Sequence, residues 1–292
     1  MRLPFRPSSL ARLPRLPRLP LLSALLALAL PAVHASAAEL PLWEIGTGPS
    51  VLNLPDYRGS DQRTTYLLPV PYLVYRGKLL RADRNGLRAM LFDSDRVDLT
   101  FSINGSLPVS SRRNQARQGM EDLRPTVEAG ANLGVDLWRS PQRDMQVGLR
   151  IPLRMAFTVE SSPRSLGWVL SPQLNLDMRA GGALAGWNFG ASAGPLFQER
   201  RFNSYYYSVA PSQATATRPA YAAPGGYAGS QVTLSTSRRH RNGWFGGFAR
   251  FDSLAGARFE DSPLVRQRSA LSVGVAYVWV LGRSSTLVDS PE

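Results

Sequence analysis

The chain has 292 residues, 34 of them lysine or arginine against 21 aspartates and glutamates, and a formal net charge of +13. It has no cysteine, which excludes disulfide bonds, zinc–thiolate sites and attachment of lipid to a leader cysteine. A basic surplus often indicates nucleic acid, but for an exported chain lipopolysaccharide, peptidoglycan or acidic solutes are the expected partners.

The N-terminus has the three parts of a secretory leader. Its first 20 residues carry five arginines and no acid, an apolar run spans Leu19 to Val33, and Ala35-Ser36-Ala37 forms a small-x-small cleavage pattern. This order predicts a signal peptide over 1–37 and export of the protein.

The remainder, 38–292, carries +13 less the five leader arginines, or +8. It has no apolar run of about 18 residues, so we expect no spanning helix. A soluble periplasmic β protein and an outer-membrane barrel remain as alternatives.

Period-2 alternation of apolar and polar residues predicts twelve strands along the chain. They cover 42–53, 65–75, 77–83, 86–92, 96–107, 123–138, 144–159, 167–179, 184–198, 227–238, 243–253 and 268–281. Arg81, Asp83 and Arg84 interrupt the alternation of the hairpin 77–92, so ten strands remain an alternative.

The length of these runs favours a membrane barrel. Every odd position from Met145 to Val159 is apolar, while Arg150 and Arg154 lie on the opposite face. A soluble strand is typically about 5–6 residues long, whereas a tilted strand that crosses a bilayer needs about 9–11.

Glycines and aromatics favour the same interpretation. Gly130, Gly134 and Gly148 fall on polar faces, where a narrow lumen leaves little room, and Trp168 and Trp279 fall on apolar faces near strand ends. We therefore predict an all-β fold, an antiparallel transmembrane β-barrel of the bacterial outer membrane, with apolar faces toward lipid and polar faces toward the lumen.

The connections alternate in length. Segments 139–143, 180–183 and 239–242 are short, whereas 108–122 and 199–226 are long and are the predicted extracellular loops. Alanine, proline, serine and threonine dominate 199–226, which predicts a mobile loop.

Eight charged residues face the lumen in the predicted register. Either opposite charges on neighbouring strands pair and fill a narrow barrel, or the arginines line a small anion-selective channel. The candidate lumen-lining residues are Arg96, Asp98, Glu128, Asp136, Arg150, Arg154, Asp177 and Arg179.

The turn Arg238-Arg239-His240-Arg241 lies on the predicted periplasmic side. Its arginines are either ordinary hydrated turn residues or a docking surface for an acidic patch on a murein enzyme or for the cell wall. Arg238, Arg239 and Arg241 are therefore the candidate docking residues.

We find no pattern that indicates catalysis, a cofactor or a metal. His240 is the single histidine beyond the leader and stands in a basic turn, unlike the nucleophile–base pairs of hydrolases. The acids Asp93, Asp95 and Asp98 lack a glycine-centred calcium loop. We therefore expect a non-enzymatic protein.

Several stretches resemble the MltA-interacting protein / outer-membrane protein V family. They are "NLPDYRGSDQRTTYLLPVPYLVYRGKLLRAD" from Asn53, "DSDRVDLTFSING" at 93–105 and "RQGMEDLRPTVEAGANLG" at 117–134. The first contains a Pro-x-Tyr-x-Gly-Ser core that begins at Pro55. The chain departs from the usual barrel pattern after Trp279, because a tail follows the last aromatic residue.

The resemblance implies an outer-membrane barrel and, for the founding member, a scaffold that ties a murein lytic transglycosylase to a peptidoglycan synthase. On this basis we expect a scaffold in cell-envelope and peptidoglycan maintenance, surrounded by outer-membrane lipid and lipopolysaccharide, with no nucleic-acid partner. The alternative is a narrow porin-like channel for small anionic solutes.

Overall fold

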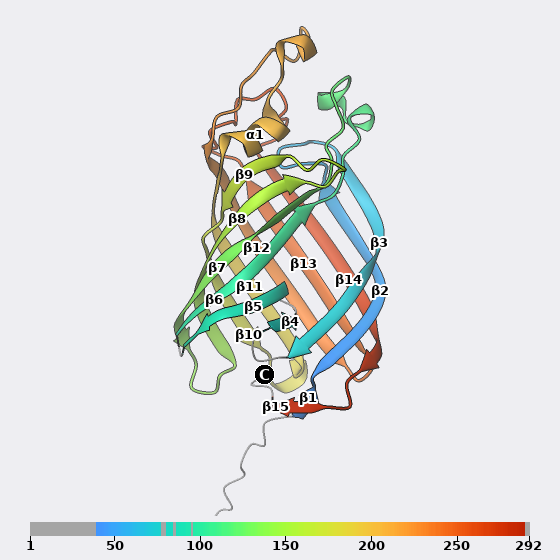
Figure 1. Ribbon diagram of the computed structural model, residues 1–292, viewed down its shortest axis with the longest axis vertical. Helices are drawn as coiled ribbons and strands as arrows, with labels where there is room; N and C mark the ends of the chain where they lie inside the picture. Colours follow the sequence, from blue (N-terminus) through green and yellow to red (C-terminus); the bar gives the residue numbers. More distant parts are fainter. Residues whose placement is uncertain (1–38, 77–79, 84–85, 95, 290–292) are drawn as a thin grey trace, which may run out of the picture. The chain divides into compact units, whose positions relative to one another are not determined.

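The computed structural model describes residues 39–76, 80–83, 86–94 and 96–289 (Figure 1). The predicted signal peptide, 1–37, and its cleavage after Ala37 lie outside these residues. Among the described residues, we find no apolar helix of the length that a membrane span needs.

The described residues form fifteen strands, one α-helix and four short 3-10 helices. The strands are β1 Glu39–Pro41, β2 Trp43–Pro55, β3 Arg63–Arg76, β4 Leu80–Asp83, β5 Gly86–Asp93, β6 Val97–Ser106, β7 Thr126–Arg139, β8 Met145–Thr158, β9 Ser165–Leu170, β10 Gln173–Arg179, β11 Trp187–Gln198, β12 Gly226–His240, β13 Gly243–Ser253, β14 Ser269–Arg283 and β15 Leu287–Asp289. The helices are η1 Ser111–Arg113, η2 Gln115–Arg117, η3 Gly182–Leu184, α1 Arg200–Tyr207 and η4 Pro211–Gln213.

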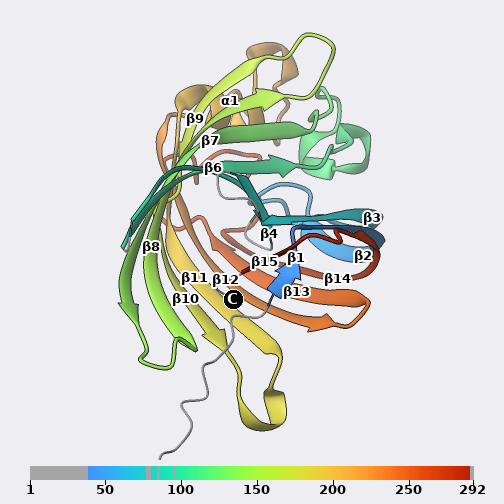
Figure 2. The same cartoon turned by 60° about the horizontal axis from the view of Figure 1, so that its bottom comes forward.

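Thirteen strands form one antiparallel sheet that closes on itself. Both β9 and β10 pair with β8 on one side and with β11 on the other, so together they occupy one position of the ring. The described strands therefore make a barrel of twelve positions, as predicted (Figure 2). Wherever neighbouring strands pair, their backbone groups are satisfied internally, which is what a hydrocarbon environment requires.

The predicted strand 167–179 is interrupted at Ser171 and Pro172. Pro172 has no N–H to donate, and the Ser171 N–H bonds the Pro152 carbonyl of β8 at 3.2 Å. The strand is therefore kinked between β9 and β10, at Pro172 and opposite Pro152 of β8.

Side-chain exposure shows which face of each strand looks outward. On β8, Leu153 is 52% exposed and Met155 is 42% exposed, whereas Ala156 is completely buried. On β14, Val275 and Trp279 are each 51% exposed, whereas Ser272, an even-numbered residue on the opposite face, is buried. An apolar outer face and a polar inner face are the arrangement of a membrane barrel, and the opposite of a soluble sandwich.

The wall glycines are needed for close approach of neighbouring strands. A Cβ at Gly130 would lie 2.1 Å from the Leu153 carbonyl oxygen, and one at Gly48 would lie 1.9 Å from that of Tyr277. The neighbouring backbone, rather than the contents of the lumen, therefore requires glycine at these two positions.

The two ends of the barrel differ. The turns 140–144, 180–186 and 241–242 lie at the end that carries β1 and β15, which pair with each other (Figure 1). The loops 56–62, 107–125, 199–225 and 254–268 lie at the other end; together they are called the cap. By the rule for outer-membrane barrels, the turn end is periplasmic and the cap is extracellular.

The prediction of a mobile loop over 199–226 is wrong. Its first part forms α1, whose Phe202, Tyr206 and Tyr207 are buried in an apolar cluster with Leu254 and Phe259. The composition is rich in small residues, but the aromatics of "RFNSYYY" bury enough surface to order the segment.

Candidate functional site: lumen, cap and periplasmic turns

Glu128 and Arg154 form an ion pair on the inner face of β7 and β8. Arg154 Nε donates to Glu128 Oε2 at 2.9 Å, and both side chains are about nine-tenths buried. Arg154 Nη2 also donates to the Ser171 hydroxyl at 3.2 Å. The pair ties strands of one wall together and neutralises two of the predicted lumen charges.

The other predicted lumen residues lie in different settings. Asp136 accepts hydrogen bonds from Arg139 and Gln146 near the periplasmic turn. Asp98 lies against Gly134, and its Oδ2 is buried without a hydrogen bond among the described residues. Arg96 and Arg179 are exposed near strand ends at the periplasmic side.

Arg150 and Asp177 are half-buried and occupy paired strands, since Gln173 of β10 stands opposite Arg150 and Gln146 of β8 opposite Asp177. In the described part of the chain, no ion pair involves Arg150. The structure therefore joins Glu128 with Arg154 but does not gather the eight residues into one site.

A second inner cluster was missed by sequence reasoning. Asp252 of β13 is buried and accepts from Arg58 Nε and Arg250 Nε, each at 2.9 Å. Arg58 Nη1 also donates to the Ala228 carbonyl at 2.7 Å. Alternation on β13 places Arg250 and Asp252 on one face, but no local signal indicates that Arg58 reaches them from another loop.

The three candidate docking arginines do not share a surface. Arg239 points inward and pairs with the completely buried Glu44 of β2. Arg238 points to the other face, where its guanidinium lies 5.6 Å from the ring centre of Trp187. Arg241 is exposed in the turn after β12.

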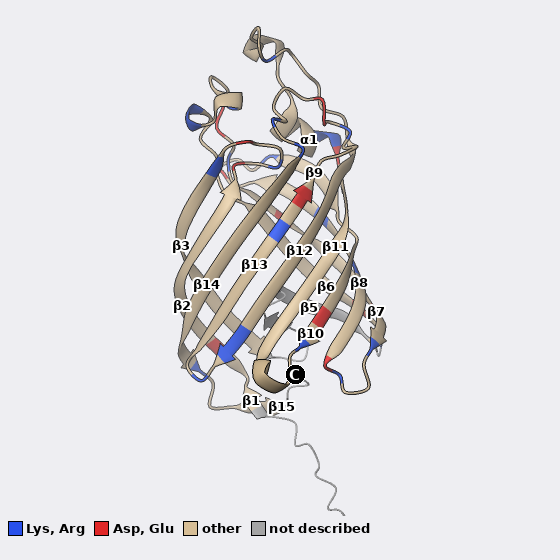
Figure 3. Ribbon diagram, turned by 180° about the vertical axis from the view of Figure 1, so that it is seen from behind, with Lys and Arg blue, Asp and Glu red and all other residues tan. Residues whose placement is uncertain are grey.

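Exposed arginines instead surround the periplasmic end; we call this set the arginine rim. Figure 3 shows that charged residues gather mainly at the two ends of the barrel, with few along the strands between them. The rim consists of Arg96, Arg139, Arg143, Arg179, Arg241 and Arg283.

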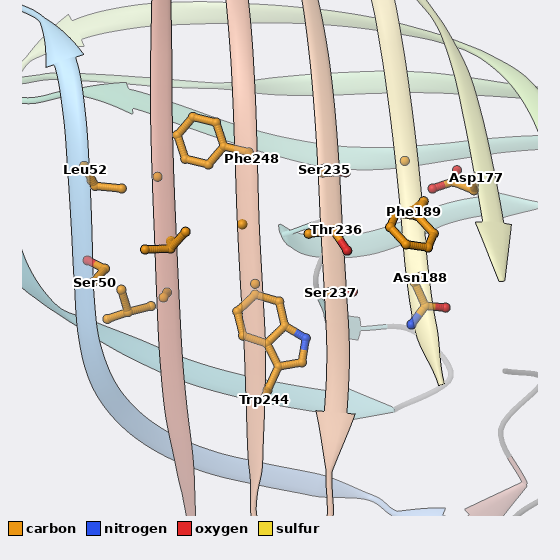
Figure 4. A pocket seen from close by; sticks show the side chains of 17 residues that line it. Ser50, Leu52, Asp177, Asn188, Phe189, Ser235, Thr236, Ser237, Trp244 and Phe248 are labelled. Atoms are coloured by element: carbon orange, nitrogen blue, oxygen red, sulfur yellow. The ribbon is translucent and has the colours of Figure 1, made fainter. Parts of the chain in front are cut away.

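A cavity of about 320 Å³ lies in the lumen. Its apolar side is formed by Leu52 of β2 and by Trp244 and Phe248 of β13 (Figure 4). Its polar side, from β10 to β12, is formed by Asp177, Asn188, Ser235 and Ser237. The cavity is therefore amphipathic across its width.

Two consecutive tyrosines of α1, Tyr206 and Tyr207, connect a strand of the wall with other loops of the cap. The Tyr206 hydroxyl lies 3.1 Å from the Ser106 hydroxyl of β6, and the Tyr207 hydroxyl donates to the Arg58 carbonyl at 2.9 Å. The Tyr207 ring also stacks on Phe259 at 3.8 Å between centroids. Because β6 and the loop around Phe259, between β13 and β14, lie on opposite sides of the ring, α1 spans the extracellular mouth.

Burial in the cap changes the protonation equilibria of its residues. It raises the pKa of Tyr57 and of Tyr207, because an ionised phenol is costly away from water. Burial also lowers the pKa of Arg117, whose guanidinium donates to the Tyr206 carbonyl at 3.0 Å. Arg117 thus holds cap loops together through carbonyl oxygens rather than through a carboxylate.

The described residues contain no group of three or more histidines, aspartates or glutamates placed to hold a metal ion. His240 ends β12 and is exposed.

Comparison with solved structures finds outer-membrane proteins. An outer-membrane channel from Pseudomonas putida F1 is 11% identical, with a TM-score of 0.42, and the match covers 85% of this chain and 98% of that one. The monoaromatic hydrocarbon channel CymD is 9% identical, with a TM-score of 0.30 and coverage of 83% and 89%. The toluene transporter TbuX from Ralstonia pickettii is 9% identical, with a TM-score of 0.28 and coverage of 85% and 71%.

Comparison with curated proteins gives no significant match. A family model described as "MltA-interacting protein MipA" matches residues 47–281, which begin within β2 and finish within β14. The chain belongs to this MltA-interacting protein family and is a β-barrel of the outer membrane.

Proposed function

We propose that this protein is a non-enzymatic outer-membrane scaffold for cell-envelope and peptidoglycan maintenance. The observation that carries the proposal is the cap, because α1 spans the extracellular mouth and its aromatic residues are buried there. A barrel closed in this way is better suited to hold a partner on its periplasmic side than to pass solutes freely.

The proposed partner is a murein lytic transglycosylase, with a peptidoglycan synthase held through it. The family's description names MltA as the interacting protein. On this chain the arginine rim is the surface that suits an acidic patch, since charge complementarity guides and orients association. Arg143 and Arg241 are two rim members that stand in turns.

Charge reversal of Arg143→Glu with Arg241→Glu tests this role. We expect loss of crosslinking to the lytic transglycosylase in isolated envelopes, with normal heat-modifiable migration of the barrel. The matched control is Arg112→Glu with Arg266→Glu, which changes two exposed cap arginines at the opposite end. Equal crosslinking by both variants and the wild type would rule out docking through the rim.

A narrow anion channel is the second candidate, supported by Arg150 on the inner face without an ion pair among the described residues. Steady anion-selective steps of the purified protein in a planar bilayer, weakened by Arg150→Gln, would support the channel over the scaffold. A silent bilayer together with intact crosslinking supports the scaffold.

A further inference from the structure

The barrel wall has a seam between β3 and β6. β3 pairs with β2 along its length but with β4 only at Tyr75 and Arg76. β6 pairs with β7 along its length, but with β5 only from Asp98 to Thr100. In the described residues, no strand pairs with β3 over 63–71 on the side away from β2, or with β6 over 101–106 on the side away from β7.

The seam has closed ends. At the extracellular end, the Tyr66 hydroxyl donates to the Pro108 carbonyl at 3.4 Å, and Gln62 Nε2 donates to the Arg113 carbonyl at 3.1 Å. At the periplasmic end, β4 and β5 join the two walls. Figure 1 shows β3 and β6 parting above β4 and β5, with β13 and β14 seen between them.

Two prolines stand on the unpaired edge of β3. Pro69 stands opposite Pro49 of β2, and two prolines cannot exchange N–H···O bonds, so this is a non-hydrogen-bonded pair. The carbonyls of Leu68 and Val70 correspondingly accept from side chains of β2. Backbone groups of the odd-numbered residues of β3 therefore point toward the seam.

The seam edge of β3 consequently lacks N–H donors at both Pro69 and Pro71. Proline at successive outward positions is a device that protects an exposed edge from strand addition. A second copy or a partner strand is therefore a poor occupant of the seam, and the seam is left to lipid and to molecules dissolved in it.

The seam leads to the amphipathic cavity. Val70, on the inner face of β3, lines the cavity together with Leu52, Trp244 and Phe248. The cap spans the extracellular mouth, so a lateral path is the direct one from the membrane core. The apolar side of the cavity suits a hydrocarbon chain or ring, and Ser235 with Ser237 offers hydroxyls to one polar group.

We propose that the seam is a lateral entrance through which a small, mostly apolar molecule with one polar group passes from the membrane into the lumen cavity. This property goes beyond the scaffold role and does not depend on it. The amphipathic lining of the cavity indicates the class of ligand. The unpaired edge of β3, protected by prolines, indicates the route by which the ligand enters.

The experiment follows quenching of Trp244 by a terminally brominated decanol dissolved in the bilayer of proteoliposomes. Bromine quenches on contact, so lipid-facing tryptophans respond in proportion to the probe in the membrane. Trp244 should add a saturable component that is absent from Trp244→Phe. Absence of any saturable component that depends on Trp244 would overturn the proposal.

Matched variants on β3 then test the route. Leu68 faces inward at the seam but does not line the cavity, while Leu67 is 74% exposed to lipid. Leu68→Tyr should slow the approach to the same quenching plateau by about tenfold, because a bulkier side chain obstructs the passage. Leu67→Tyr should leave both rate and plateau unchanged.

Equal rates in Leu68→Tyr and the wild type would show entry through an end of the barrel and would overturn the lateral route. Val70→Phe provides a second obstruction should Leu68→Tyr not assemble, and it should lower the plateau as well because Val70 lines the cavity.

Discussion

At the scale of single residues, the inner wall is held by a few charged groups with specific partners. Glu128 and Arg154 are paired at 2.9 Å, whereas Arg139 and Asp136 form a more exposed pair near the turn. A pair removed from water is costly to break, because the remaining charge keeps its desolvation penalty without its partner. The two pairs should therefore differ greatly in their importance for stability.

Glu128→Gln should lower the free energy of unfolding by roughly 3 kcal/mol, since it leaves the Arg154 guanidinium without its carboxylate. Arg139→Gln, at the exposed pair, should cost at most about 1 kcal/mol. Urea titration of the barrel in liposomes measures both values. Similar costs for the two variants would show that the lumen is too well hydrated for burial to matter.

The buried tyrosines of the cap give a pH dependence. Tyr57 and Tyr207 have pKa values raised above the ordinary value of about 10 by burial. Above that pH the unfolded cap ionises while the folded cap keeps its protons, so the unfolded state binds fewer protons. The stabilisation is present below pH 10 and is lost as the pH rises toward the folded-state pKa.

An absorbance titration of the tyrosines should accordingly show a group that ionises later than the exposed ones. Tyr207→Phe should remove one late-ionising phenol while keeping the ring that stacks on Phe259. Titration of all tyrosines in one step near the ordinary value would contradict a packed cap.

At the scale of elements, β3 and α1 decide how the barrel communicates with its surroundings. α1 spans the mouth through its tyrosines, and β3 leaves an edge that carries Pro69 and Pro71. Helix α1 therefore restricts access at the extracellular end, whereas β3 leaves part of the wall without a paired strand.

Replacing Pro69 and Pro71 by alanine restores two N–H donors at the seam. We expect the double variant to form more edge-to-edge oligomers than the wild type, because an unprotected edge is a template for pairing. Light scattering in detergent measures this, with Pro152→Ala on β8 as the control. An unchanged mass distribution would mean that the prolines do not protect the edge.

At the scale of the whole molecule, the outward apolar surface makes the fold a membrane barrel. Leu153 is 52% exposed on the outer face of β8, directly beside the inward Arg154. One face of the strand therefore contacts lipid and the other contacts the lumen. Introducing a charged residue should destabilise the barrel far more on the lipid-facing side.

Leu153→Arg should destabilise the barrel by about 2–4 kcal/mol, the cost of an arginine on the lipid face near the bilayer centre. Asn175→Arg, on the inner face of β10, should be tolerated with a much smaller loss, because the lumen offers water and carboxylates. Folding yield into liposomes and heat-modifiable migration compare the two. Equal tolerance would mean that the outer face of β8 does not lie in hydrocarbon.

The sequence predicts which segments form strands and which residues share a face, because both properties depend only on residues close together in the chain. The alternation from Met145 to Val159 sets which residues of β8 share a face, and period 2 holds whatever the strand pairs with. Ten of the twelve positions of the ring, and the inward direction of Glu128 and Arg154, follow from the same period, whereas the hairpin 77–92 interrupts it.

Only the tertiary structure decided which distant residues meet. Arg58 reaches Asp252 and Arg239 reaches Glu44 across more than 190 positions, and no local pattern encodes such encounters. The ordered structure of the cap also depends on contacts between distant residues, since the α1 aromatics become buried only when the other loops fold against them. The seam is also a property of the closed ring: alternation specifies a strand's faces, but its neighbours, and where pairing stops, depend on how the whole sheet closes.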